Sequence, residues 1–386
     1  MINLRHVGPV ERLGYVFSAE GNTREYRVSN PSLIRERPDS GEPDWMIYRS
    51  VFHFQHPDPN LRASAHCDRA VLNNGTWTKE GAVLLPSDPW ETGRSWNCFG
   101  VEDPRVERLP DLGLDVMAYC GGTNAGPRVA VAVSQDKGRT WRKLGYIHFP
   151  DQPHLNEWDN KNAVWLPYPV LSPSGRRCFA LIHRAKPSMT RMPTFKHGVE
   201  DVEDAMRTDP AERPAMWIGY VPVEAALADV RNLTRIEETK RIFTPADVPW
   251  EPKNQVGLGA GSQFLKIPGV GWLTMYHTVH VRNYTEGQRD AVTGRYDLSH
   301  CNGLMLFDLE QPHKVLHVAS PCFYPETPEE LGDPGAPDLA FLSTKVVFVT
   351  FIEFETPTTL IAWYGAGDRH VARARVTLAE PIPGVA

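Results

Sequence analysis

The sequence contains no long run of charge of one sign and no apolar stretch that approaches the length of a membrane span. Its 41 basic and 47 acidic residues give a net charge of −6, so it shows no electrostatic footprint for nucleic acid or for an anionic membrane. Residues 1–6 lack the basic and apolar regions of a secretory signal. We therefore expect a cytoplasmic protein that binds neither nucleic acid nor membrane.

Cysteine is also scarce and unpatterned. The six cysteines are scattered, form no Cys-x-x-Cys pair and are too few for a disulfide framework, so we expect most of them to be small buried hydrophobic residues. No cluster of His, Cys and carboxylate residues has the spacing of metal ligands. The sequence therefore predicts neither a metal site nor a cofactor.

Long helical periodicity is nearly absent. Short apolar runs recur instead, each bounded by Gly, Pro, Asp or Asn, and the chain contains 34 Pro and 30 Gly. This pattern predicts an all-β protein, and because no linker divides the chain, residues 1–386 are expected to form one closed architecture of the β-propeller type. The predicted strands include residues 45–54, 114–119, 128–134, 178–183, 216–221, 271–277, 303–309, 346–351 and 360–364.

Three segments differ from the predicted pattern of short strands. Residues 134–141, from Ser134 through Asp136 and Gly138 to Trp141, look like the Asp-box turn of propeller blades, in which Asp and Gly shape a hairpin and Trp packs between strands. Asp136 is therefore assigned to the turn and not to catalysis. Residues 224–230 predict a brief helix. The long polar connection 186–214 is expected to be partly helical and to act as a lid or an interface.

The strongest chemical signal is the stretch Gly100-Val101-Glu102-Asp103-Pro104-Arg105. Two adjacent carboxylates repel each other, Pro104 pushes Asp103 toward an extended conformation, and Arg105 supplies a charge that would let one acid stay ionised while the other keeps its proton. This is how a general acid can be tuned. The alternative is an ordinary solvated surface turn, since Asp-Pro is common in turns.

Further candidates lie at the ends of predicted strands, where a propeller gathers side chains around its axis. Lys161 lies between two Asn residues before an apolar run, the run 178–183 ends in His183-Arg184, and the run 271–277 ends in Tyr276-His277. Each signal is weak by itself, because a lone Lys is often a solvated loop cation and a strand His is often a hydrogen-bonded core residue.

In combination these stretches resemble glycoside hydrolase family 130, the β-mannoside phosphorylases and related mannosidases, which are five-bladed β-propellers. The likeness runs over most of the chain, although only Glu102-Asp103-Pro104-Arg105 is distinctive by itself. The matching stretches, in order, are 30–32 with Tyr48-Arg49, 100–105, Pro127-Arg128, 160–164 with Pro167, His183-Arg184, 256–261, 272–277, 304–309 with Pro312 and Val315-Leu316, and 363–368.

The resemblance implies an inverting mechanism in which Asp103 is the general acid, in several relatives acting through a sugar hydroxyl. Inversion needs an acid at the leaving group and a nucleophile on the opposite face. In hydrolysis a carboxylate must activate water, whereas phosphate is already an oxyanion and needs only cations to hold it. Phosphorylases of the family carry basic side chains there, and this chain offers four candidates for phosphate: Arg128, Lys161, Arg184 and His277.

The same resemblance assigns recognition of the mannosyl hydroxyls to Asn30, Arg49, Glu102, Arg105, Asn162 and Tyr276. Residues 334–338 depart from the family pattern near the last blade, and the acid expected there is either missing or supplied by Asp333 or Asp338; we count Asp338 among the substrate-binding candidates. His277 also precedes Thr278 where the family often has Gly. Trp96, Trp165 and Trp250 are available to stack on a sugar, although Trp in a propeller is more often part of the core.

The predicted function is therefore phosphorolysis of β-mannosides to α-mannose 1-phosphate, with a β-mannoside and inorganic phosphate as co-substrates. Because relatives are frequently oligomers, a homo-oligomer is a further expectation, with 186–214 as a contact arm. The first alternative is an inverting β-mannosidase of the same family. A sialidase-like propeller hydrolase should show several Asp boxes, and only one good box is visible; a non-catalytic carbohydrate-binding propeller would use the charged motifs as salt bridges between blades.

Overall fold

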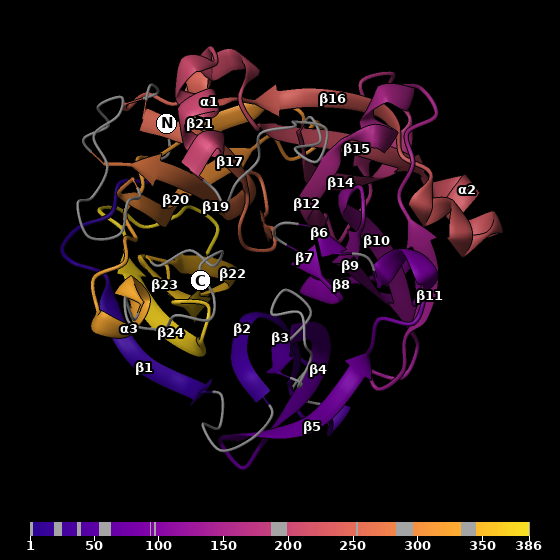
Figure 1. The fold of residues 1–386 in the computed structure, drawn as a ribbon, viewed down its shortest axis with the longest axis horizontal. Coiled ribbons are helices and arrows are strands. Elements are labelled where there is room, and N and C mark those ends of the chain that lie inside the picture. The colour runs from indigo at the N-terminus through magenta and orange to yellow at the C-terminus, as the bar shows by residue number, and fades with distance from the viewer. Residues whose placement is uncertain are drawn as a thin grey trace.

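Five antiparallel sheets are arranged around a common centre as the blades of a five-bladed β-propeller (Figure 1). The computed structural model describes residues 3–18, 25–36, 40–53, 63–92, 94–95, 98–186, 199–251, 254–282, 296–332 and 345–385. Each apolar run predicted from the sequence overlaps a strand of one of these sheets. The prediction of an all-β propeller is therefore confirmed.

The first three blades follow one another along the chain, each with antiparallel neighbours. Blade I contains β2 (Glu25–Ile34), β3 (Trp45–His53), β4 (Ala63–Asn73) and β5 (Thr76–Leu84). Blade II contains β8 (Val101–Leu109), β9 (Leu114–Thr123), β10 (Gly126–Ser134) and β11 (Arg142–Tyr146). Blade III contains β12 (Asp159–Trp165), β13 (Val170–Leu171), β14 (Arg177–Lys186), β15 (Met216–Pro222) and β16 (Glu237–Phe243).

The last blade joins the two ends of the chain and so closes the ring. Strand β1, in indigo, pairs antiparallel with β24, in yellow, with Glu11 opposite Arg375 (Figure 1). Blade IV contains β17 (Gln255–Ala260), β18 (Leu265–Ile267), β19 (Gly271–Val281), β20 (Leu298–Phe307) and β21 (Val315–Val318). Blade V contains β22 (Val347–Thr356), β23 (Thr359–Ala366), β24 (His370–Thr377) and β1 (Glu11–Ser18), and a separate pair is formed by β6 (Arg94–Ser95) and β7 (Cys98–Phe99).

The first strands of blades I, II and III share an irregularity that matters for the site. Strands β2 and β12 both contact β8, and in each of the three the register with the second strand shifts by a bulge. An Asn or Asp with positive φ lies within each bulge: Asn30 at 53°, Asp103 at 57° and Asn162 at 56°. Asn and Asp tolerate this left-handed conformation better than most residues, and bulges re-aim side chains. The chain thus turns three polar side chains in equivalent places out of the regular alternation.

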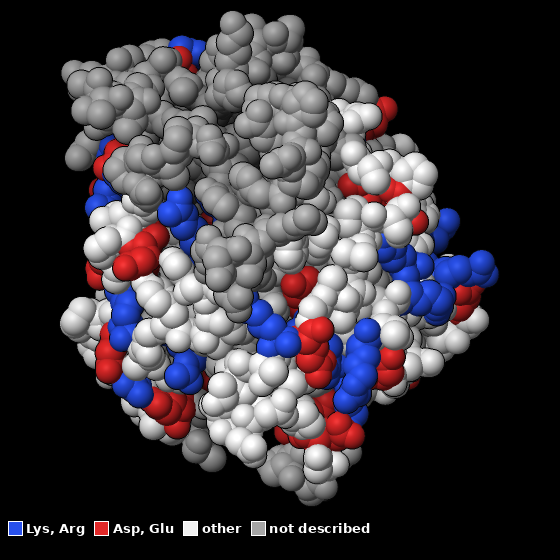
Figure 2. Space-filling view, turned by 60° about the horizontal axis from the view of Figure 1, so that its bottom comes forward, with Lys and Arg blue, Asp and Glu red and all other residues white. Residues whose placement is uncertain are grey.

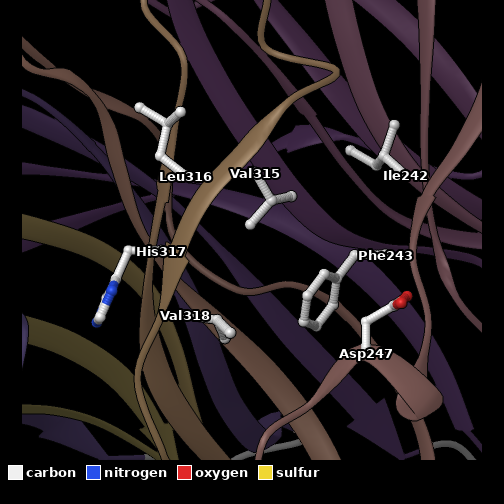
Figure 3. A pocket seen from close by; sticks show the side chains of 7 residues that line it. All are labelled: Ile242, Phe243, Asp247, Val315, Leu316, His317 and Val318. Carbon is white, nitrogen blue, oxygen red and sulfur yellow. The ribbon is translucent and has the colours of Figure 1, made fainter.

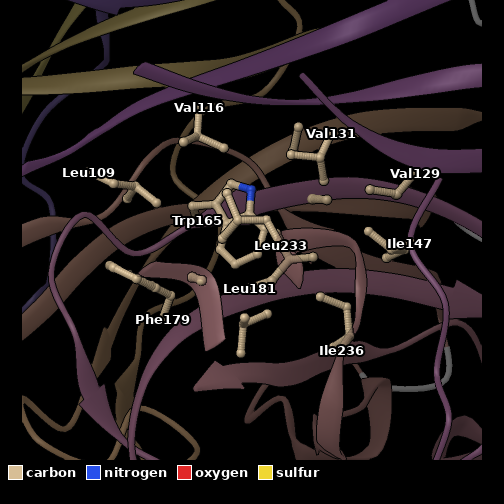
Figure 4. Close-up of a cluster of buried hydrophobic side chains, with 14 of the residues drawn as sticks. Leu109, Val116, Val129, Val131, Ile147, Trp165, Phe179, Leu181, Leu233 and Ile236 are labelled. Atoms are coloured by element: carbon tan, nitrogen blue, oxygen red, sulfur yellow. The ribbon is translucent and has the colours of Figure 1, made fainter. Parts of the chain in front are cut away.

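Apolar side chains fill the spaces between blades. Between blades II and III, Trp165 of β12 lies among Val116 of β9, Val131 of β10 and Leu181 of β14 (Figure 4). Trp165 is fully buried. Trp165 is therefore a core residue and is not available to stack on a sugar, so this candidate from the sequence is wrong.

The predicted Asp-box turn is present between β10 and β11. The Asp136 carboxylate accepts hydrogen bonds from Ser134 Oγ (2.8 Å) and from the backbone and hydroxyl of Thr140 (2.9 and 2.7 Å), while Trp141 Nε1 donates to Gly138 O (3.0 Å). Gly138 has φ of 71°, and a Cβ there would collide with the Trp45 ring. The assignment of Asp136 to the turn is confirmed.

The helices of the described residues are short: α1 (Val199–Arg207), α2 (Val223–Ala228) and α3 (Pro328–Leu331). Helix α2 confirms the helix predicted for 224–230, and α1 confirms that the connection 186–214 is partly helical. Val202 and Ala205 of α1 pack on blade IV, and Arg213 Nη1 donates to Gln255 O (2.6 Å). Residues 187–198 of this connection lie outside the described residues. The described part of the connection is thus attached to the start of β17.

On the face shown in Figure 2, acidic and basic side chains are interspersed. On the outside of the ring a groove of about 460 Å³ lies between β16 and β21, lined by apolar side chains together with Asp247 and His317 (Figure 3). Within the described ranges, no helix is both long and apolar enough to cross a membrane. Cys67, Cys120, Cys178 and Cys301 are buried thiols, as predicted for most of the cysteines.

Candidate active site

Arg49 of β3 ties together three carboxylates that are far apart in the sequence. Its Nη1 atom donates to Glu102 Oε2 and to Asp103 Oδ1, both at 2.9 Å, and its Nη2 atom donates to Asp368 Oδ1 at 2.8 Å. Its Nε atom donates to Ser29 Oγ at 3.1 Å. The Arg49 side chain is only 8% exposed, so these bonds are formed away from bulk water. Glu102 and Asp103, predicted from one stretch of sequence, therefore belong to a wider buried network.

Asp103 has two further partners on neighbouring blades. Asn30 Nδ2 of β2 donates to Asp103 Oδ1 at 2.7 Å, and Lys161 Nζ of β12 lies 3.6 Å from Asp103 Oδ2. Burial by itself raises the pKa of Asp103, but the charges of Lys161, Arg49 and Arg105 outweigh burial and hold this pKa well below its usual range. Asp103 is therefore an ionised carboxylate at neutral pH. We call Asn30, Arg49, Glu102, Asp103 and Asp368 the acid side.

Arg105 does not play the part that the sequence suggested. Its Nε atom donates to Gly261 O at 3.2 Å and its Nη1 atom donates to Pro104 O at 3.0 Å, while its guanidinium lies 5.3 Å from the centre of the Phe348 ring. The groups that pair directly with the two acids are Arg49 and Lys161, because the bulge in β8 turns Asp103 away from Arg105. Arg105 affects Asp103 only through its charge at longer range, and burial lowers the pKa of Arg105 to about 10.

Two of the predicted phosphate-binding residues meet on the next two blades. Arg184 Nη1 of β14 donates to His277 Nε2 of β19 at 3.1 Å, and since Nε2 accepts, Nδ1 carries the proton and faces Ala260 O at 3.3 Å. Both side chains pass over Gly259, where a Cβ would lie 3.0 Å from His277 Cε1 and 3.1 Å from Arg184 Cδ. A glycine at this point in β17 allows the arginine and the histidine to approach each other.

Lys161 connects the two groups of residues. In the pairing of β12 with β14 it lies directly opposite Arg184, so the two side chains leave the sheet as neighbours on one face. Its Nζ atom lies 3.7 Å from Glu102 Oε1 and 3.6 Å from Asp103 Oδ2. Lys161 therefore stands between the carboxylates of blade II and the basic residues of blades III and IV.

The structure adds His300 of β20 to this basic group. Its ring is nearly parallel to that of His277, at 6° with centroids 6.3 Å apart, and His277 also packs on Phe348 at 4.6 Å. Burial lowers the pKa of His300 to about 4, and burial together with the Arg184 charge holds the pKa of His277 well below its usual range. Both imidazoles are therefore neutral at physiological pH. We call Lys161, Arg184, His277 and His300 the cation side.

Tyr276 is not part of this arrangement. Side chains alternate along a strand, so with His277 facing the cation side Tyr276 points to the opposite face of β19. Its hydroxyl donates to Ala319 O at 2.8 Å, and its ring packs near Trp250. The structure therefore does not bring Tyr276 together with the other candidate residues, and Trp250 belongs to the same packing between blades.

Arg128 and Asn162 occupy less central positions. Arg128 Nη1 lies 3.6 Å from Asp159 Oδ1 and donates a hydrogen bond to Pro127 O at 3.0 Å. These contacts attach the guanidinium to the start of β12. Neither contact involves a residue of the acid side or of the cation side. Asn162 is buried, and its Oδ1 atom has no hydrogen-bond partner among the residues that the structure describes. The candidates Asp338, Asp333 and Trp96 lie outside the described residues.

Sequence reasoning missed Asp368, His300 and Phe348 as parts of the site. Asp368 is the last residue of the stretch 363–368 that matched the family. Its positive φ of 57° belongs to the turn between β23 and β24. A Gly-Asp pair in a sequence indicates a turn, so the pair gave no sign of a role in the site. His300 precedes an apolar strand and looks like a core residue. Only the pairing of Asp368 with Arg49 and the stacking of His300 on His277 reveal their place.

Among the described residues no group of three His, Cys, Asp or Glu side chains is arranged to hold a metal ion. No protein-family model matches the sequence, and no curated protein matches it. Solved structures do match over nearly the whole chain. A β-1,2-mannobiose phosphorylase from Listeria innocua in complex with β-1,2-mannobiose is 16% identical, with 95% of this chain and 96% of that chain covered and a TM-score of 0.62.

A protein of the family 130 mannoside phosphorylases, a family that contains glycoside hydrolases that target β-1,2 mannosidic linkages in Candida mannan, is 16% identical, with 99% and 97% covered and a TM-score of 0.64. A mannose phosphorylase from Leishmania mexicana in complex with phosphate ion is 12% identical, with 97% and 93% covered and a TM-score of 0.50. At this low identity the match concerns the fold. The chain therefore has the five-bladed fold of glycoside hydrolase family 130, and the resemblance found in its motifs is confirmed at the level of the fold.

Proposed function

We propose that this protein is an inverting glycoside phosphorylase that cleaves β-mannosides with inorganic phosphate and releases α-mannose 1-phosphate. The observation that carries the proposal is the opposition of the two sides: a carboxylate, Asp103, on one side of Lys161, and a pair of basic residues, Arg184 and His277, on the other. Inversion requires an acid and a nucleophile on opposite faces of the sugar.

The cation side suits phosphate better than it suits an activated water. A phosphate oxyanion needs positive charge and N–H donors, which Lys161 and Arg184 provide, and Arg is well suited to bind phosphate through two parallel bonds. A hydrolase needs a carboxylate base at the nucleophile. Asp368 raises the pKa of His300 through its charge, but its carboxylate is already bound by Arg49.

The acid side suits a sugar. Buried polar atoms normally have hydrogen-bond partners, yet Asn30 Oδ1, Glu102 Oε1 and Asn162 Oδ1 have none among the described residues. Sugar hydroxyls would provide the missing donors. These three residues lie on the first strands of blades I, II and III, so a mannosyl unit held by them would be placed beside Asp103.

The fold match supports the substrate class. The Listeria structure is a phosphorylase with β-1,2-mannobiose bound, and the Leishmania structure is a mannose phosphorylase with phosphate bound. Phosphate is in this proposal a co-substrate, and the reaction requires no organic cofactor.

The test is to incubate the purified protein with β-1,2- and β-1,4-linked mannobiose, with and without inorganic phosphate, and to follow products by proton NMR. We expect α-mannose 1-phosphate that forms only when phosphate is present. Free mannose released at the same rate without phosphate would establish a β-mannosidase instead. Binding of mannobiose without any cleavage would establish a carbohydrate-binding propeller.

A further inference from the structure

Asp103 is held in a form that cannot act as an acid. Its Oδ1 atom accepts hydrogen bonds from Asn30 (2.7 Å) and Arg49 (2.9 Å), and its Oδ2 atom faces Lys161 Nζ at 3.6 Å. A carboxylate that is bound to positive groups favours its ionised state. The proton that a glycosidic oxygen must receive is therefore absent from Asp103 until some charge in its surroundings changes.

The partners of Asp103 lie at different distances from its carboxylate. Arg49 is fixed by Ser29, Glu102 and Asp368 as well as by Asp103, at distances of 2.8 to 3.1 Å. Lys161 Nζ is farther from the carboxylates, at 3.6 and 3.7 Å, which is beyond an ordinary hydrogen bond but within ion-pair range. Of Arg49 and Lys161, Lys161 therefore makes the longer contact with Asp103, and this longer contact is the one with which an incoming anion would compete.

The register of the strands places Lys161 where an anion on the cation side would reach it. Lys161 lies opposite Arg184 in the β12–β14 pair, and Arg184 is bound to His277. The other charged or titratable groups that influence Asp103 from the surrounding strands are Glu102 and Arg105 on β8, Arg49 on β3, Cys67 on β4 and, through Arg49, Asp368. Among these groups Lys161 lies beside Arg184, and Arg105 acts on His277 through its charge.

We propose that an anion bound on the cation side causes Asp103 to become protonated. Phosphate pairs with Lys161 and so weakens the ion pair between Lys161 and Asp103. Asp103 then takes up a proton, which it gives to the glycosidic oxygen. This inference rests on the proposed phosphorylase function and adds a coupling between its two substrate sites. In this scheme Lys161 has two roles: it contacts phosphate, and its charge controls whether Asp103 carries the proton.

The protons of the reaction balance. Hydrogenphosphate carries one proton, the mannose 1-phosphate dianion carries none, and the released alcohol carries one. The C–O bond to the aglycone breaks as a C–O bond to phosphate forms, and Asp103 transfers the proton and returns to the carboxylate with which it began. No oxidant, reductant or other co-reactant is needed. An acid that is protonated only when phosphate is present would also avoid unproductive activation of the substrate without its nucleophile.

The experiment measures how anion affinity depends on pH, with sulfate as the probe because sulfate does not titrate in this range. Isothermal titration calorimetry of the wild type between about pH 5.5 and 8 should show affinity that falls as pH rises, with a limit of about tenfold per pH unit for one coupled proton. Asp103→Asn should bind sulfate more tightly at pH 8 and show a much smaller pH dependence. A wild type without pH dependence, or an Asp103→Asn variant that keeps it, would overturn the coupling.

Further variants test whether the pH dependence of sulfate affinity comes from Asp103, from a histidine or from a general effect of substitution. His300→Gln should keep the pH dependence, since the proton is assigned to Asp103, and loss of the dependence in this variant would overturn that assignment. Lys161→Met should weaken binding and remove the dependence, whereas Lys161→Arg should restore both. The matched control is Asp115→Asn, a buried carboxylate of the same blade that pairs with Arg108 and should behave as the wild type.

The result also distinguishes this inference from the proposed function. A protein that makes mannose 1-phosphate but binds sulfate without pH dependence contradicts the coupling alone. A protein that binds neither sulfate nor phosphate and makes no mannose 1-phosphate contradicts the phosphorylase function, and the coupling with it.

Discussion

The two sides of the candidate active site are buried to a similar degree, yet their titratable groups are in opposite states of charge. On the acid side, Asp103 keeps its charge because Arg49, Lys161 and Asn30 compensate for the loss of water. On the cation side, His277 and His300 lose theirs, because burial disfavours the imidazolium and Arg184 adds a like charge nearby. The comparison teaches that neighbours, and not burial alone, decide whether a buried group is charged.

The same strand supplies a second example. Glu107 lies four residues after Asp103 in β8 and is also buried, but its Oε1 atom has no partner among the described residues. Burial raises the pKa of Glu107 well above its usual range, whereas the pKa of Asp103 is held well below it. Two carboxylic acids on one strand therefore have pKa values that are shifted in opposite directions.

The largest effect is expected from removing the proton carrier of the acid side. Asp103→Asn should lower kcat for phosphorolysis of mannobiose by a factor of about 10² to 10⁴, because the amide has the shape of the acid and accepts the left-handed backbone but has no proton to transfer. The assay is release of mannose 1-phosphate, with circular dichroism as the check on folding. Asp115→Asn is the control, and full activity of Asp103→Asn would exclude Asp103 as the acid.

Removing a group from the cation side should affect phosphate more than sugar. Arg184→Met should raise the KM for phosphate by about 10- to 100-fold, since a hydrogen bond to a charged group contributes about 1.5–3 kcal/mol. His277→Ala should raise it as well, because His277 Nε2 holds the guanidinium of Arg184 in place. The KM for mannobiose should change little. Steady-state kinetics with each substrate varied in turn measures the two constants, and Arg176→Met, an exposed arginine bound to Glu238, serves as the control. An unchanged phosphate KM would remove these residues from the phosphate site.

The neutral histidines make stability depend on pH in a defined direction. Burial lowers the pKa of His183 to about 3 and that of His300 to about 4, and His277 lies well below 6.5. Below about pH 6.5 the unfolded chain binds protons that the folded chain does not, so the free energy of unfolding falls by up to about 1.4 kcal/mol per pH unit for each histidine. Asp103 adds nothing in this window, because its carboxylate stays ionised until a lower pH.

Urea denaturation at pH 7, 6 and 5 measures this dependence. His183→Gln should reduce the change of the free energy of unfolding per pH unit by the contribution of one histidine. Substitution of the exposed His154 should leave this change as it is in the wild type. An identical slope in His183→Gln would show that His183 is protonated in the folded protein or remains neutral in the unfolded one.

The smallest effect is expected at Glu107. Because burial raises the pKa of this side chain and so favours the protonated acid, Glu107→Gln, which has the shape of that neutral acid, should change stability by less than about 1 kcal/mol. Phosphorolysis should be unaffected. Thermal denaturation at neutral pH is the measurement, and a loss of several kcal/mol would show that Glu107 is an ionised member of a network, as Asp103 is.

Much of the site could be predicted from local sequence. Glu102-Asp103-Pro104-Arg105 and Lys161 stood out by their residue types, and Arg184 and His277 by their positions at the ends of apolar runs. The pairing of Asp103 with Arg49 was not predicted as such, and Arg105 was given a role that Arg49 and Lys161 fill. Adjacent residues in a bulged strand do not point the same way, so proximity in sequence was a poor guide to contact.

Tyr276 and His277 show the same limit. Both belonged to one matching stretch, but the alternation of a strand sends one to the site and the other to the core. The register of β19 with β17, which places His277 opposite Gly259, is decided by pairing across the sheet and not by the residues themselves.

The sequence by itself determined the strands, because apolar runs bounded by Gly, Pro and Asn are a local property of the chain, and it determined which residue types are available for acid and anion chemistry. Only the tertiary structure decided which charges meet and which groups are ionised. Asp368 reaches Arg49 across 319 positions of sequence, and the protonation of Asp103, Glu107 and His277 depends on distances to other charges and on exclusion of water, which exist only once the five blades have closed into a ring.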